Sequence, residues 1–198
     1  MKQKHHLAYV GALGLLLVTA ACGNIEDDTK CATLLGGGRY CLQPSTAVTP
    51  FVAHQKIEIR SRNTIETMIA ELEIDATGIR IVGLTPFGHT LLNVNYDNRN
   101  ASAVRVTDAR LRPALLVGLV QLALWSAADL RAGLGAPLWL EENPSQRRIM
   151  NRNEPSLTIS YTGDHPPYDR IRMNIHGTGI ELDISTIRED VPNPLELE

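Results

Sequence analysis

The sequence lacks the motifs that mark the common classes of enzyme and of nucleic-acid-binding protein. It contains no Gly-x-Ser-x-Gly, no His-Glu-x-x-His and no phosphate-binding glycine loop, the patterns that place a serine nucleophile, a zinc ion or a nucleotide phosphate. Its formal net charge is −3, and no basic stripe suggests a nucleic-acid partner. We therefore expect no enzymatic activity, no catalytic residues, no cofactor, no metal site and no nucleic acid.

Cysteine is also scarce, with three in the chain, and the first of them follows an apolar run. Lys2 and Lys4 precede the apolar residues 7–21, and Cys22 comes directly after them. These 15 apolar residues are fewer than the roughly 17 that a membrane-spanning helix needs. We therefore interpret residues 1–21 as a cleaved signal peptide.

The end of this run resembles the lipobox of bacterial lipoproteins, with Thr19 standing where Leu is usual. The resemblance implies that the Cys22 thiol takes a diacylglyceryl group and becomes the new amino terminus. Two or three acyl chains would make the anchor effectively permanent. Gly23 stands where an inner-membrane retention signal would place Asp, which favours the periplasmic face of the outer membrane. The alternative is an ordinary secreted protein cut nearby.

The rest of the chain is long enough for one domain with its own core. Loss of residues 1–21 removes two lysines and takes the formal charge from −3 to −5. We interpret residues 22–30 as a lipidated tether, residues 31–187 as a single domain and residues 188–198 as an acidic flexible tail.

Cys31 and Cys41 are the only other cysteines. In an oxidising compartment they are free to form a disulfide, because residues 36–38 are glycines that permit a tight turn. A two-thiol metal site is the alternative, but no histidine lies nearby in the sequence.

Alternation of apolar and polar residues begins near Phe51 and is typical of half-buried strands. Short turns at 76–78, 98–100 and 176–179 join such runs and indicate antiparallel neighbours. We therefore predict a mainly β domain. The alternating apolar residues are Ile57 and Ile59; Leu92, Val94 and Tyr96; Leu157, Ile159 and Tyr161; Ile171, Met173 and Ile175; Ile180, Leu182 and Ile184.

One segment is helical in character and almost wholly apolar. Pro113 suits a first helical position, and Gly133 and Gly135 suit a helix end, so residues 113–134 are expected to cover the sheet. Between 114 and 125 the only strongly hydrogen-bonding side chain is Gln121. We expect a sheet that curls around this helix, which is too short to cross a membrane. The space inside is either a solid core or a ligand cavity lined or gated by Leu116, Leu119, Val120 and Trp125.

Three stretches together carry a family resemblance: residues 36–44 around Cys41, residues 84–89 with Tyr96-Asp97, and residues 115–125. They resemble a group of Gram-negative lipoproteins that are known as a domain of unknown function and tend to be encoded near enzymes of fatty-acid-like or aryl polyene biosynthesis. The arrangement of strands, loop and helix is also similar to LolB, which receives lipoproteins from the carrier LolA. That resemblance implies an antiparallel, incomplete (half-open) β-barrel with a helical lid over an apolar cavity.

The LolB resemblance assigns a role to the loop Pro86-Phe87-Gly88. In LolB the matching loop carries an exposed apolar residue that acts at the membrane. Phe87 either stands out in this way, toward lipid or a partner, or folds inward to plug the core. Arg110 and Arg112 precede the helix start, where an anionic lipid head group would offset their unfavourable position; the alternative is that both are solvated.

These observations give two hypotheses. The first is an outer-membrane lipoprotein that binds or accepts an acyl chain or a lipoprotein cargo, passed on by a LolA-like carrier, without bond chemistry. The second is a structural or assembly lipoprotein with a solid core that recruits a protein partner.

Overall fold

The computed structural model describes residues 28–34, 37–108 and 111–188. Within these ranges, ten strands form one antiparallel sheet and two more form a hairpin. The hairpin is β1 (Cys31–Thr33) and β2 (Arg39–Cys41). The sheet contains β3 (Phe51–Ser61), β4 (Thr64–Asp75), β5 (Gly78–Leu84), β6 (Thr90–Tyr96), β7 (Ala101–Val106), β8 (Leu138–Asn143), β9 (Gln146–Asn151), β10 (Glu154–Thr162), β11 (Arg170–Ile175) and β12 (Ile180–Thr186).

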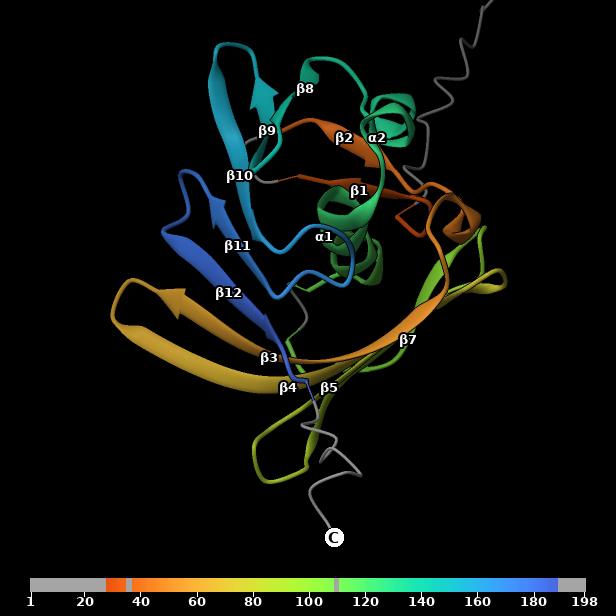
Figure 1. Ribbon diagram of the computed structural model, residues 1–198, viewed down its shortest axis with the longest axis vertical. Helices are drawn as coiled ribbons and strands as arrows, with labels where there is room; N and C mark the ends of the chain where they lie inside the picture. The colour runs from red at the N-terminus through yellow and green to blue at the C-terminus, as the bar shows by residue number, and fades with distance from the viewer. Residues whose placement is uncertain (1–27, 35–36, 109–110, 189–198) are drawn as a thin grey trace, which may run out of the picture.

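The strand order is β7-β6-β5-β4-β3-β12-β11-β10-β9-β8, so two meanders meet where β12 pairs with β3. The predicted antiparallel, mainly β architecture is confirmed. Strands β7 and β8 are the two edges, and the sheet does not close on itself. Figure 1 shows the sheet curving around helix α1 (Pro113–Leu124), which lies on its concave side.

The predicted turns are present and depend on side chains that hydrogen-bond to the backbone. The Asp75 carboxylate accepts from the backbone N–H groups of Thr77 at 2.7 Å and Gly78 at 3.0 Å. In the β11–β12 turn, Gly177 and Gly179 have φ angles of 76° and 70°, which only glycine adopts without strain. The turn residues therefore fix the strand register that the alternation requires.

The helical segment differs from the prediction, because residues 113–134 form two helices. Helix α1 ends at Leu124, and α2 (Ala127–Gly133) begins after a break. Ser126 is the N-cap of α2, and its side-chain oxygen accepts a hydrogen bond from the Asp129 backbone at 3.3 Å. A serine followed three residues later by an acid is a helix-start signal inside the apolar run. Within the described ranges, no helix has the length and apolar character that crossing a membrane requires.

The β1–β2 hairpin contains the predicted disulfide between Cys31 and Cys41, which face each other in the register. This hairpin spans the opening between the two sheet edges. The Thr29 carbonyl, just before it, accepts from the Ala101 backbone of β7 at 2.7 Å. At its far end, the Gly37 carbonyl accepts from the Asn151 side chain of β9 at 3.0 Å. We call residues 29–34 and 37–43 the N-terminal strap.

The end of the predicted tether is part of this strap. Besides Thr29, the Lys30 carbonyl accepts a hydrogen bond from the Leu42 backbone at 2.9 Å. The predicted signal peptide, Cys22 and residues 189–198 of the predicted tail lie outside the described residues.

Candidate functional site

One face of helix α1 is fastened to the strap by its single polar side chain. The Gln121 side-chain oxygen accepts from the Tyr40 hydroxyl at 3.0 Å and from the Gln43 backbone at 2.8 Å, and its amide donates to the Gln43 carbonyl at 2.7 Å. Gln121 and Tyr40 are fully buried. Burial raises the pKa of Tyr40, so the hydroxyl stays neutral and remains a donor. The strap and the helix therefore form one unit.

The same helix face approaches the strap closely. A Cβ on Gly118 would lie 3.2 Å from the Cβ of Ala32. Trp125 belongs to this face too, since it is fully buried and its indole N–H donates to the Pro44 carbonyl at 3.0 Å. The sequence predicted that Trp125 lines a cavity together with Leu116, Leu119 and Val120, but in the structure it lies on a different face. The reason is that its indole N–H needs a hydrogen-bond acceptor, which the strap side supplies.

The C-terminal end of α1 is closed by a buried cation. Arg147 donates to the Leu122 carbonyl at 2.7 Å, and its guanidinium pairs with Glu142 at 2.5 Å. The Tyr161 hydroxyl donates to the next carbonyl, of Ala123, at 2.9 Å. A cation at this end is favoured by the helix dipole, and Glu142 compensates its charge. The last carbonyls of the helix are therefore satisfied inside the protein.

The remaining face of α1 carries four aliphatic side chains that are only half-buried. We call Leu115, Leu116, Leu119 and Val120 the aliphatic stripe. At 100° per residue, the stripe lies opposite Gly118 and Gln121. It therefore points away from the strap, on a helix that lies on the concave side of the sheet (Figure 1).

The middle of that concave face carries a second half-buried apolar surface. We call it the inner shelf; it consists of Ile57, Ile59, Ile180 and Leu182. Leu182 pairs with Ile59 across the β12–β3 ladder, so the two lie side by side on the face that also holds the buried Met68. Stripe and shelf belong to the same hydrophobic core, and neither is fully covered by the other.

The loop between β5 and β6 projects from the sheet. Phe87 is 89% exposed at its tip, with Pro86 and Gly88 exposed on either side. The Gly88 backbone donates to the Thr85 carbonyl at 2.9 Å, and Gly88 has a φ of 85°. Of the two placements that the sequence left open for Phe87, the structure has the outward one.

Arg112 has a partner within the protein. Its guanidinium pairs with the Asp28 carboxylate beside the first turn of α1. The negative charge expected there is thus supplied by the chain itself. Arg110 lies outside the described residues.

The described residues contain no group of three His, Cys, Asp or Glu side chains that could hold a metal ion. Residues 52–188 match the model of a protein family described as "Protein of unknown function (DUF3261)". The match covers β3 except its first residue, β4 to β12 and both helices, and so includes the stripe and the shelf. It begins after the strap. No curated protein matches the chain.

Proposed function

The chain belongs to the DUF3261 family, and we propose that it is a lipid-anchored protein that binds or accepts an acylated molecule between the aliphatic stripe and the inner shelf. The proposed mechanism is transfer, without bond chemistry. The proposal includes lipidation at Cys22, attachment to the periplasmic face of the outer membrane, and delivery of the acyl chain or lipoprotein cargo by a LolA-like carrier.

The observation that carries the proposal is the half-burial of eight aliphatic side chains on two surfaces of one core. Apolar burial is worth about 25 cal/mol per Å². An acyl chain laid between stripe and shelf would complete the burial of both, and each leucine or isoleucine would contribute about 1 kcal/mol.

The surroundings of the stripe support a site that opens without unfolding. The polar contacts of α1 lie on its strap side, through Gln121, and at its C-terminal end, through Arg147. None of these contacts involves a stripe side chain. A ligand can therefore enter against purely apolar groups, with the helix held in place as it does so. A helix over an open antiparallel sheet is also the architecture that the LolB resemblance implies.

A fluorescent fatty acyl probe tests the proposal. The mature chain, with Cys22 replaced by Ser so that it carries no lipid of its own, should bind the probe saturably. Leu119→Asp places a charge in the stripe and should weaken binding at least about tenfold. Val104→Asp is the matched control, because Val104 is 78% exposed on the edge strand β7. Absence of saturable binding by the unsubstituted chain would reject the proposal.

Native mass spectrometry of the same protein after periplasmic expression identifies the cargo class. A stoichiometric acyl species released by organic extraction would name it. An empty protein that also refuses the probe would favour the second candidate function.

That second candidate is a structural or assembly lipoprotein that recruits a protein partner, and the exposure of Phe87 favours it. Phe87→Glu should then abolish partner capture and leave acyl binding unchanged. Val52→Glu is the matched control, because Val52 is 57% exposed on β3, toward the end of the strands opposite the β5–β6 loop. Loss of capture by both variants would show that the loop is not the specific contact.

A further inference from the structure

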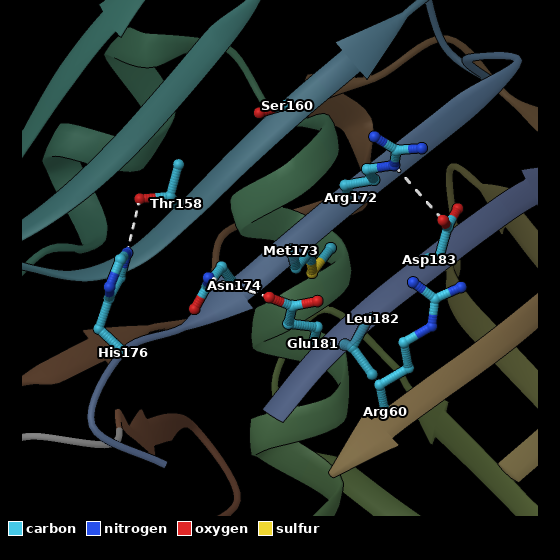
Figure 2. A pocket seen from close by; sticks show the side chains of 10 residues that line it. All are labelled: Arg60, Thr158, Ser160, Arg172, Met173, Asn174, His176, Glu181, Leu182 and Asp183. Carbon is cyan, nitrogen blue, oxygen red and sulfur yellow. Dashed lines mark hydrogen bonds and ion pairs between the residues drawn. The ribbon is translucent and has the colours of Figure 1, made fainter. Parts of the chain in front are cut away.

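A depression of about 440 Å³, lined by polar and apolar side chains, lies on the convex face of the sheet, on the side opposite helix α1. Figure 2 shows it over β10, β11 and β12, with side chains from all three strands and from β3. The residues of its lining that matter here are Arg60, Thr158, Ser160, Arg172, Asn174 and Asp183.

The strand register places these side chains in rows across the sheet. Ser160 pairs with Arg172, and Arg172 pairs with Asp183. In the next row, Asn174 pairs with Glu181. Because every second residue of a strand faces the same side, the neighbours of Arg172 along the chain point into the core. The depression is therefore built on the rigid centre of the sheet.

Asp183 fixes the positions of two arginines. Its side chain is 9% exposed, and it accepts from Arg170 at 2.6 and 2.5 Å and from the Nε of Arg172 at 3.4 Å. The hydrogen bonds from Arg170 hold the pKa of this carboxyl below its usual range, so it is ionised at neutral pH. Both of these Arg170 hydrogen bonds, from Nε and Nη2, go to the Asp183 carboxylate.

Arg172 has hydrogen-bond donors that Asp183 does not occupy. Its side chain is 63% exposed, and within the described residues its two terminal nitrogens have no hydrogen-bond partner. The adjacent Ser160 hydroxyl likewise has no partner among the described residues. Across the depression, the Arg60 side chain has one ion-pair partner among the described residues, Glu58 at 3.2 Å. The N–H donors of Arg172 and the O–H donor of Ser160 thus face solvent together.

The charged side chains that line the depression are Arg60 and Arg172 against Glu181 and Asp183, so their formal charges balance. Asp183 is bound by Arg170 and Arg172, and Arg60 pairs with Glu58. The donors that remain for a ligand are the unpaired Arg172 nitrogens.

We propose that this depression binds an oxyanion, a carboxylate or a phosphate, carried by a polar hydroxyl-bearing molecule. The planar guanidinium of Arg172 matches two oxygens of such a group. Ser160 donates a further hydrogen bond. The Thr158 hydroxyl, 2.8 Å from His176 Nε2, and the Asn174 amide, which donates to Glu181 at 3.4 Å, lie beside them, where hydroxyl groups of the same molecule would add a further contact (Figure 2). The site is separate from the aliphatic stripe and does not depend on acyl binding.

Isothermal titration of the full mature lipoprotein in nonionic detergent, at low salt, tests the proposal with inorganic phosphate, glucuronate and glucose as probes. Both anions should bind at one site and glucose should not. Arg172→Gln should weaken both at least about tenfold. Arg105→Gln is the matched control, because Arg105 is exposed on the edge strand β7, far from the depression in the strand order. Tighter binding of glucuronate than of phosphate would point to a carboxylated sugar, and the reverse order to a phosphorylated one.

Ser160→Ala gives an independent reading and should weaken both anions about threefold. Circular dichroism melts should show the native fold in all three variants, because each substitution is on the convex face. The proposal is rejected if the unsubstituted protein binds neither anion. It is equally rejected if Arg172→Gln and Arg105→Gln lose the same affinity, since diffuse surface charge would then explain the binding.

Discussion

Gln121 and Gln43 exchange two hydrogen bonds, with the side-chain oxygen of Gln121 accepting at 2.8 Å and its amide donating at 2.7 Å. The Gln121 side chain therefore pairs with the Gln43 backbone in the way that a neighbouring strand would. This contact sets how α1 is rotated about its axis, and that rotation turns the aliphatic stripe away from the strap.

Gln121→Leu should lower the free energy of unfolding by about 3 kcal/mol. The leucine would leave the Tyr40 hydroxyl and both backbone groups of Gln43 without their partner, in a site where Gln121 is fully buried. Urea unfolding measures the difference. Gln146→Leu, at a partly buried position on β9, should stay within about 0.5 kcal/mol, and an equal loss in both variants would contradict this account.

A tryptophan in the stripe distinguishes open space from a solid core. Leu119→Trp should be tolerated, with a loss below about 1 kcal/mol, and should reduce acyl-probe binding by occupying the same space. Val117→Trp is the control, because Val117 is fully buried; overpacking there should cost about 1–3 kcal/mol. Equal destabilisation by both substitutions would indicate that no space adjoins the stripe.

Phe87→Glu should leave the thermal midpoint unchanged, since the ring is 89% exposed and makes no core contact that folding depends on. It should, however, reduce sedimentation with phospholipid vesicles or capture of a protein partner. Either loss would assign the loop to contact outside the chain, whereas unchanged behaviour in both assays would leave Phe87 without that role.

Loss of the disulfide between Cys31 and Cys41 should destabilise the protein by about 2.5–3 kcal/mol, from the short loop that it closes. The Cys31→Ser/Cys41→Ser double variant should show this loss in urea unfolding with or without reductant. The unsubstituted protein should show it only with reductant. Insensitivity of the unsubstituted protein to reductant would mean that the bond does not form.

Asp183 should make stability depend on pH in the acid range. Its folded pKa is lowered by Arg170, so its contribution is present above the unfolded value of about 3.9 and is lost as pH falls through the folded value. The stability difference between the unsubstituted protein and Asp183→Asn should be largest near neutral pH and shrink below about pH 4. A difference that does not vary with pH would contradict the ion pair.

Sequence periodicity predicted the strands well, because a half-buried strand alternates apolar and polar residues and a tight turn needs glycine where φ is positive. The hairpin of β11 and β12 is an example. The break between α1 and α2 was missed, because apolar character gives no sign of where a helix stops; the cap at Ser126 does. The roles of Trp125 and Arg112 depend on Pro44 and Asp28, which are far away in the sequence.

The convex depression could not be predicted from the sequence either, because its residues come from strands that are separate in the chain. Polar residues at alternate positions are what any solvated strand face shows. Only the pairing of Arg172 with Ser160 and Asp183 across three strands makes them a cluster.

The attachment of Thr29 to β7 limits how the domain can sit on a membrane. Thr29 comes seven residues after Cys22, a reach of at most about 25 Å. Phe87 lies at the other end of the β5–β6 hairpin from the Asn100 turn that Thr29 contacts, and the seven residues of β5 alone span about 23 Å. If acyl chains hold Cys22 in the bilayer, this reach is about the length of the hairpin, so Phe87 can touch the same bilayer either with the tether fully extended or with the hairpin lying along the surface. A hairpin that points away from the bilayer would instead present Phe87 to a partner on the far side.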